Sequence, residues 1–411
     1  MVQFERFTLT NGLRVIFHKD TTTPLAVVNT LYDVGARDEH PDKTGFAHLF
    51  EHLMFGGSIN IPDFDTPLQL AGGESNAFTS NDITNYYDIV PGVNLETALW
   101  LESDRMLSLA FTPKSLETQR NVVMEEFKQR YLNQPYGDVW LELRPLAYVS
   151  HPYQWATIGK ELKHIEDATM EDVKDFFSKF YNPSNAILCI AGNFELEYIK
   201  QVVEKWFGDI PEGIKPARIL PKEPKQEILR EKIIERKVPS DAIYFAFKMP
   251  ERKSFEYYAA DILSDAIGRD KSSRLYVRLQ KELKLVTDIF AYITGSIDEG
   301  LLIIEAKLSD SKTFLEVEEA VWNVLNEIKS EIISNKELKR LKNKINTAKA
   351  FQEQGMLNRA MNLSFFELLG DANGVNEEQK IIDQINENQI HTMANQILNP
   401  QNCSILKVKA I

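Results

Sequence analysis

Cysteine is nearly absent from this sequence, because the chain of 411 residues contains only Cys189 and Cys403. Both lie in apolar, strand-like runs, so we expect two buried reduced thiols and no disulfide framework. Long apolar runs are also absent, and none reaches the roughly 18 residues that a membrane-spanning helix requires. The first residues lack the apolar core of a secretory signal, so the sequence predicts a cytoplasmic protein without membrane association.

Positively charged residues are fewer than negatively charged ones. The chain has 47 Lys and Arg residues and 60 Asp and Glu residues, which gives a net charge of −13. Nucleic acids are bound through clustered lysine and arginine side chains, so a nucleic-acid partner is not expected. Hydrophobic residues make up 43% of the chain and charged residues 26%, which is typical of a globular protein. A chain of this length is expected to form two or three domains.

Proline is concentrated between the two halves of the chain. Four prolines, at positions 211, 216, 221 and 224, lie in a stretch that is also rich in Lys and Glu. Proline cannot donate a hydrogen bond to a helix or sheet and keeps the chain extended, which is typical of a semi-rigid linker. We therefore predict an N-terminal domain over residues 1–215, a linker over residues 216–230 and a C-terminal domain over residues 231–411.

The two halves also resemble each other in sequence. Residues 165–183 and 382–400 carry apolar residues at matching positions, each with helical spacing, and both segments end in Asn-Pro. Thr169 and Asn386 are candidate N-caps of the two helices, and a strand-like run follows each segment. Helix, Asn-Pro and strand is a common succession of elements, but the matched spacing favours an internal duplication.

The remaining patterns predict a mixture of strands and helices. Asn11 and Gly12 lie between two strand-like runs, which is a strong hairpin pattern. Hairpins are frequent, and strands and helices alternate irregularly, which favours an α+β fold. The predicted architecture is two structurally similar domains, each a largely antiparallel sheet with helices packed on one face. The expected elements include a strand over residues 25–34 and helices over residues 44–55, 95–107 and 113–131.

The strongest chemical pattern is His48-Leu49-Phe50-Glu51-His52, which lies within a predicted helix. Residues four apart share one face of a helix, so His48 and His52 can bind the same metal ion. Glu51 lies at the edge of that face, where a carboxylate can take a proton from a metal-bound water. The order H-x-x-E-H is the inverted zinc-peptidase motif of the inverzincins. The alternative is a solvated helix face with two incidental histidines.

A catalytic zinc site needs a third protein ligand, and Glu125-Glu126 is the candidate pair. Adjacent residues on a helix point about 100° apart, so at most one of the two glutamates faces the metal. Val122, Val123 and Phe127 are expected on the buried side of this helix, with Glu126 beside them. Taken alone, a glutamate pair within a helix is more typical of an exposed charged face than of a metal site.

HLFEH followed by RNVVMEE resembles the M16 peptidase family, which includes pitrilysin, insulin-degrading enzyme and the mitochondrial processing peptidase. The similarity extends to GARDEHPDKTGFAHLFEHLMFGGS, GGESNAFTSNDITNYY and FYNPSNAILCIAGNF, which are close to the compact bacterial members. The resemblance implies one zinc ion per chain, with His48, His52 and Glu126 as ligands and Glu51 as general base. It also implies that Asn76, Ala77, Phe78 and Thr79 form an exposed edge strand that pairs with the backbone of a peptide substrate.

The sequence departs from the family pattern in two places. Many relatives carry a second glutamate seven residues before the ligand glutamate, and this chain has Gln119 there, so the surroundings of the metal can differ. Complete enzymes of the family also carry an Arg and a Tyr that hold the substrate, and this chain has Gln280 and Thr287 at those positions. In two-subunit relatives a sister chain supplies that pair, so we expect a heterodimer with a homologous M16 subunit, while a homodimer stays open.

The resulting expectation is a zinc-dependent endopeptidase that hydrolyses short or unfolded peptides, held as an added strand in an enclosed chamber. Two alternatives retain the fold without hydrolysis. One is a peptide-binding or scaffold subunit of an M16-type complex, and the other is a peptide-binding chaperone. The complete set of His48, Glu51 and His52 favours the enzyme.

Overall fold

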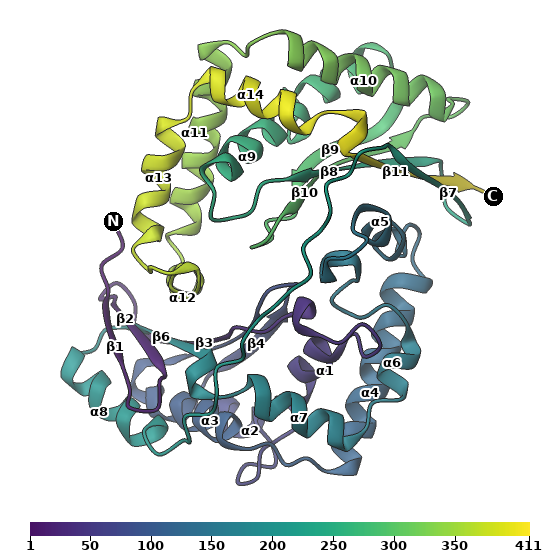
Figure 1. The fold of residues 1–411 in the computed structure, drawn as a ribbon. Coiled ribbons are helices and arrows are strands. Elements are labelled where there is room, and N and C mark those ends of the chain that lie inside the picture. The colour runs from purple at the N-terminus through teal and green to yellow at the C-terminus, as the bar shows by residue number, and fades with distance from the viewer. The chain divides into compact units, whose positions relative to one another are not determined.

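The computed structural model describes residues 1–411 and divides them into two compact units (Figure 1). The first unit consists of Met1–Lys128, Trp155–Leu220 and Lys349–Glu377, and the second of Gln129–Gln154, Pro221–Ala348 and Glu378–Ile411. Each unit therefore includes one segment from the other half of the sequence. No helix or strand forms between Phe207 and Arg230, where the proline-rich stretch lies. The division into domains 1–215 and 231–411 stays a prediction.

The first unit contains a sheet of six strands in the order β1-β2-β6-β3-β5-β4. Strands β2 and β6 are parallel, and all other neighbours are antiparallel. Strand β4 lies at one edge, so one side of its backbone is not paired within the sheet. The six strands are β1 (Glu5–Thr8), β2 (Arg14–Lys19), β3 (Leu25–Tyr32), β4 (Glu74–Thr79), β5 (Thr84–Pro91) and β6 (Ala186–Gly192).

The second unit repeats this topology with five strands in the order β7-β11-β8-β10-β9. Its single parallel pair, β7 with β11, corresponds to β2 with β6, and its other pairs are antiparallel as in the first sheet. The predicted α+β class with two similar sheets is therefore confirmed. The strands are β7 (Arg230–Arg236), β8 (Ala242–Met249), β9 (Val286–Ile293), β10 (Gly300–Leu308) and β11 (Cys403–Ala410).

The helix that precedes the last strand of each half begins in the same way. The predicted N-caps Thr169 and Asn386 are confirmed, because each begins its helix with a capping box. None of the helices is both long enough and apolar enough to cross a bilayer. The helices of the first half are α1 (Phe46–Leu53), α2 (Asp65–Leu70), α3 (Leu95–Leu107), α4 (Pro113–Phe127), α5 (Val139–Ala147), α6 (Leu162–Glu166), α7 (Met170–Phe180) and α8 (Leu196–Phe207). Those of the second half are α9 (Phe255–Gly268), α10 (Phe314–Ser330), α11 (Asn335–Gln352), α12 (Met356–Leu369), α13 (Gly374–Gln384) and α14 (Glu387–Ile397).

One helix in each unit comes from the other half of the chain. In the first unit α12 packs over β2, β3 and β6, on the side of the sheet opposite to α1, α3 and α7 (Figure 1). In the second unit α5 packs over β7, β8 and β11, opposite to α9, α10 and α14 (Figure 1). Helices therefore cover both faces of each sheet. This explains why every residue of the central strands β6 and β8 is buried.

The predicted buried thiols are confirmed, because Cys189 in β6 and Cys403 in β11 are both free and buried. Cys189 lies in the apolar cluster between the first sheet and α12, together with Leu363 and Ala360. Burial raises the pKa of both thiols, which keeps them protonated and unreactive.

Candidate metal centre

The helix α1, which carries the H-x-x-E-H sequence, begins at a glycine in an unusual conformation. Gly45 has a φ of +89°, and a Cβ atom there would lie 2.6 Å from the carbonyl oxygen of Ile158. Only glycine accepts both the left-handed backbone and the close approach. The helix therefore starts at Phe46, two residues later than the predicted start at Thr44.

A buried glutamate holds the first turn of α1. The carboxylate of Glu39 accepts hydrogen bonds from the backbone N–H groups of Gly45 (2.9 Å) and Ala47 (2.8 Å). These donors have no partner inside the helix, and a carboxylate at a helix N-terminus also interacts favourably with the helix dipole. Burial raises the pKa of Glu39 well above its usual value, although the two amide N–H groups act in the opposite direction. Nothing in the sequence pattern identified Glu39.

The apolar face of α1 fixes which way its polar residues point. The ring of Phe50 stacks on Phe176 and Tyr181, with centroid distances of 4.9 Å and 5.1 Å. Leu49 and Leu53 are buried as well. This packing against α7 leaves His48 and His52 together on the side of α1 that faces α4.

The helix α4 supplies the third donor of the cluster. Its two adjacent glutamates point in different directions, as the geometry of a helix requires. The side chain of Glu125 is 61% exposed and pairs with Lys128. The side chain of Glu126 is 19% exposed and lies beside α1. The expectation that Val122 is buried is wrong, because this residue is 44% exposed. Leu116, Val123 and Phe127 already form the buried stripe of α4, and Val122 lies about 100° away from Val123.

The donor atoms of His48, His52 and Glu126 all lie within 4.8 Å of one another. The Oε2 atom of Glu126 is 3.6 Å from Nε2 of His48 and 3.3 Å from Nε2 of His52. Zinc–nitrogen and zinc–oxygen bonds of about 2.0–2.1 Å in a tetrahedral arrangement separate neighbouring ligand atoms by about 3.4 Å. These two distances and the chemistry of the donors therefore fit one tetrahedral zinc ion, with a position left for water or substrate.

Glu51, the predicted general base, contacts the predicted substrate strand. The hydroxyl group of Thr79 donates a hydrogen bond of 2.5 Å to Oε2 of Glu51. Thr79 is the last residue of the edge strand β4, so this strand and the metal helix meet at the candidate site. The roles of Glu51 and Thr79 stay predictions.

The other predicted residues of the edge strand also lie in β4. Asn76 and Phe78 are exposed, whereas Ala77 and Thr79 are half-buried, as strand alternation requires. The N–H group of Ala77 donates to the side-chain oxygen of Asn76 (2.8 Å), so this N–H points away from β5. The edge therefore presents backbone groups that an added strand could use.

Gln119 and the pair Gln280 and Thr287 mark the departures from the family pattern. Gln119 is half-buried on α4, two turns before Glu126 and on the same face, and its influence on the metal stays a prediction.

In the second unit the Gln280 side chain donates to the carbonyl oxygen of Thr287 (2.8 Å). The two positions are therefore neighbours in space.

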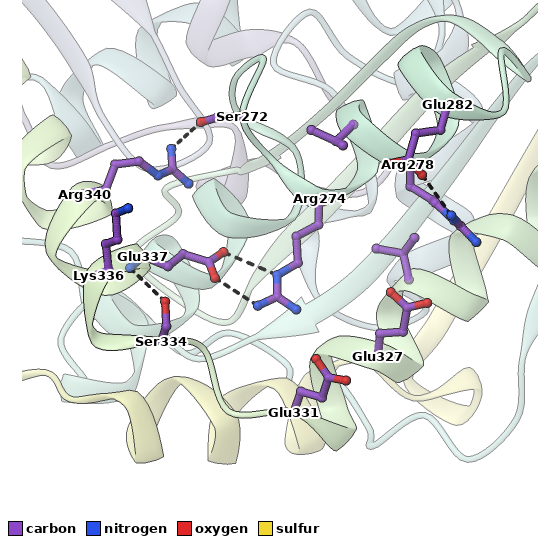
Figure 2. Close-up of a pocket in the computed structure, with 12 residues that line it drawn as sticks. Ser272, Arg274, Arg278, Glu282, Glu327, Glu331, Ser334, Lys336, Glu337 and Arg340 are labelled. Carbon is purple, nitrogen blue, oxygen red and sulfur yellow. Dashed lines mark hydrogen bonds and ion pairs between the residues drawn. The ribbon is translucent and has the colours of Figure 1, made fainter.

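A separate pocket in the second unit is lined by charged residues of both signs (Figure 2). Its three arginines form ion pairs within the unit, Arg274 with Glu337 (3.0 Å), Arg278 with Glu282 (2.8 Å) and Arg340 with Asp270 (3.4 Å). The charges of these arginines are thus compensated locally. The pocket contains no histidine or cysteine, so it offers neither a typical zinc ligand set nor a reactive thiol.

The H-x-x-E-H order on α1, with both histidines beside a third carboxylate donor, is the inverted zinc motif of metallopeptidases. Residues 14–148 match the family model described as Insulinase (Peptidase family M16). Residues 167–345 match the model described as Peptidase M16 inactive domain. The chain therefore belongs to peptidase family M16.

Named relatives support this assignment. The zinc protease PqqE of Helicobacter pylori is 32% identical over 344 residues, which are 82% of this chain and 77% of that protein. The mitochondrial-processing peptidase subunit beta of Saccharomyces cerevisiae is 27% identical over 358 residues, which are 83% of this chain and 76% of that protein. The crystal structure of a protease from Helicobacter pylori superposes with a TM-score of 0.94 at 28% identity and covers 100% of both chains.

Proposed function

We propose that this chain is a zinc-dependent endopeptidase that hydrolyses short or unfolded peptides. The observation that carries the proposal is the convergence of the donor atoms of His48, His52 and Glu126 beside Glu51. Relatives named as zinc proteases support a peptidase-like function. A cluster kept only for stability would not need two partly buried imidazoles and a carboxylate at ligand distances.

His48, His52 and Glu126 would hold the metal ion. A zinc ion bound there supplies Lewis-acid chemistry, because it polarises a carbonyl group and lowers the pKa of water to about 7. The carboxylate of Glu51 accepts a proton from the attacking water and later delivers it to the nitrogen of the leaving amine. Glu51 suits this task because it lies on α1 between the two histidines and its side chain is already held by Thr79.

The substrate is proposed to bind as an extended strand along β4. Backbone groups at the free edge can pair with any peptide in an extended conformation, so this contact sets no sequence preference. Asn76 and Phe78 are exposed on the same strand, and Phe78 is 40% exposed, so these side chains can contact the side chains of the peptide. Pairing with the edge also demands a substrate that is short or unfolded, because a folded protein does not present a free strand.

A homologous M16 subunit is the proposed partner. The second half of the chain matches a model described as inactive. Its helix α9 packs on the edge strand β9 as α1 packs on β4, and at the spacing of His48, Glu51 and His52 it carries Ala260, Leu263 and Ser264, all buried. Gln280 and Thr287 cannot provide the charge of an Arg and Tyr pair. One relative is named as a subunit of a processing peptidase, which supports assembly of two chains. A homodimer is the alternative.

The test combines metal content with cleavage. The Glu51→Gln variant should retain zinc, measured by elemental analysis, and lose cleavage of a quenched peptide library. His52→Ala and Glu126→Ala should lose both, whereas the control Glu125→Ala should lose neither, because Glu125 is exposed and turned away. Each variant is measured alone and together with a candidate partner, a homologous M16 chain that carries the Arg and Tyr pair. Peptide retention without any cleavage in both conditions would instead support a non-hydrolytic binding or scaffold subunit.

A further inference from the structure

We propose that Thr79 is a positioning residue for Glu51, which links the peptide-binding edge strand to the group that moves the proton. This inference rests on the proposed function. It assigns to Thr79 a second task, because the residue was expected only to pair with the substrate. The observation behind it is the hydrogen bond of 2.5 Å from the Thr79 hydroxyl to Oε2 of Glu51.

The direction of the Thr79 side chain follows from the strand. Side chains alternate along β4, so Ser75, Ala77 and Thr79 are half-buried toward the helices, whereas Asn76 and Phe78 are exposed on the other face. The helix α1 packs against β4 on this side. The side chain of Thr79 therefore faces α1 because of the strand register, and its hydroxyl group is the atom that contacts Glu51.

The backbone of Thr79 faces the peptide-binding edge. Along an antiparallel strand, the residues whose N–H and C=O groups point to the neighbour alternate with those whose groups point away. The N–H group of Ala77 is used by the Asn76 side chain and points away from β5, so the groups of Thr79, two residues later, point outward as well. Thr79 can thus contact a peptide with its backbone and Glu51 with its side chain.

The end of β4 is held firmly in place. The turn that follows it is closed by a hydrogen bond from the Ser80 N–H to the carbonyl oxygen of Ile83 (2.8 Å). The N–H of Ala36 donates to the carbonyl of Ser80 (3.1 Å), and a Cβ atom on Gly35 would lie 2.5 Å from Asn81, so the turn is packed closely against residues 35–36.

The same loop also fixes the metal helix. Three residues after Ala36, the carboxylate of Glu39 binds the first turn of α1. A single short loop therefore anchors both the strand that carries Thr79 and the helix that carries Glu51. Because both partners are fixed, the hydrogen bond orients the Glu51 carboxylate before a substrate arrives, which lowers the entropic cost of proton transfer.

The experiment compares Thr79→Val, which replaces the hydroxyl by a methyl group of similar size, with Thr79→Ser, which keeps the hydroxyl. Loss of a partner that orients a reacting group typically costs about 10–100-fold. We expect Thr79→Val to lower kcat by about this factor with little change in KM and with unchanged zinc content, and Thr79→Ser to restore most of kcat. Ser75→Ala is the matched control, because it removes a hydroxyl from the same face of the same strand.

A second measurement does not depend on cleavage. Melting temperatures of the metal-free protein are compared for Thr79→Val, Glu51→Ala and the double variant. If the two side chains are bonded, the double variant loses less than the sum of the single losses.

The outcomes separate the inference from the proposed function. If the wild-type protein with its partner cleaves no peptide, the proposed function fails, and the melting temperatures alone decide whether the hydrogen bond exists. If the wild type cleaves and Thr79→Val retains its kcat, or changes only KM, Thr79 does not position Glu51. The inference is also overturned if Thr79→Ser is as slow as Thr79→Val, or if the losses in melting temperature are additive.

Discussion

The Nε2 atom of His52 lies 3.3 Å from Oε2 of Glu126, although 74 positions separate these residues in the sequence. Two elements that are remote in sequence, α1 and α4, thus meet through one imidazole and one carboxylate. His48 completes the cluster from the same helix as His52, at 3.6 Å from the same oxygen atom. A metal ion that binds all three therefore connects α1 to α4 and is expected to stabilise the first unit.

Metal removal should lower the melting temperature. A ligand that binds only the folded state adds about 2.7 kcal/mol at a free concentration of 100 times its Kd. We expect zinc to raise the melting temperature of the wild-type protein and a chelator to reverse this, as measured by calorimetry. His48→Ala should melt at the same temperature with and without zinc. An equal zinc response of His48→Ala and wild type would show that the ion binds elsewhere.

The sequence identified the chemistry that is local to one helix. His48, Glu51 and His52 could be predicted because residues four apart share a face wherever α1 lies in the fold. The apolar stripe favoured Glu126 over Glu125, but only the family resemblance implied that Glu126 is a metal ligand, since an isolated helix does not reveal what covers its faces. Val122 was misplaced for the same reason, because the buried stripe of α4 is narrower than its apolar residues suggest.

Other features depend on contacts that no periodicity reveals. Glu39 precedes α1 by seven residues and binds its first turn only because the loop folds back on the helix.

The apolar positions of α12 predict a buried face but not the sheet that covers it. Leu363 and Ala360 pack on the first sheet, although both lie in the second half of the sequence. The likeness of the two sheets followed from the duplication, whereas their strand order and the packing of α12 and α5 on the sheet of the other half did not.

Glu39→Ala should weaken the start of the metal helix. The N–H groups of Gly45 and Ala47 would lose their acceptor inside the protein, and an unsatisfied buried group costs about 1–3 kcal/mol. We expect a loss of this size in the free energy of unfolding, measured by urea denaturation, together with weaker zinc binding. Glu117→Ala is the control, because Glu117 is exposed on α4. Unchanged stability of Glu39→Ala would mean that water replaces the carboxylate.

Cutting the chain in the proline-rich segment should not release two independent halves. The first sheet is covered by α12 and the second by α5, so each half lacks a helix that it needs to bury an apolar face. We expect a protease site inserted near residue 218 to give two fragments that stay together in size-exclusion chromatography. Expressed alone, residues 1–215 should aggregate or bind a hydrophobic dye, and co-expression with residues 216–411 should rescue them. A stable, dye-free fragment 1–215 would show that this half folds without α12.

Protonation of His18 should lower the stability of the folded protein in weakly acidic solution. Its Nδ1 atom lies 2.6 Å from the carbonyl oxygen of Gln3, and its Nε2 atom accepts a hydrogen bond from Nε of Arg359 (2.9 Å). The ring is therefore neutral with the proton on Nδ1, and protonation of Nε2 would replace the acceptor that faces the Arg359 guanidinium by a second positively charged donor. Burial is the main cause that lowers the pKa of His18, and Arg359 adds to it, while Gln3 and Asp20 oppose it.

A lowered pKa in the folded state means that the unfolded chain binds more protons near pH 6. The stability that depends on neutral His18 is therefore complete above an unfolded pKa of about 6.5 and decreases as the pH falls below it. His18→Gln keeps a donor and an acceptor but does not titrate. We expect the melting temperature of the wild type to fall more than that of His18→Gln between about pH 8 and about pH 5. Parallel curves for the two proteins would show that His18 has the same pKa in the folded and unfolded states.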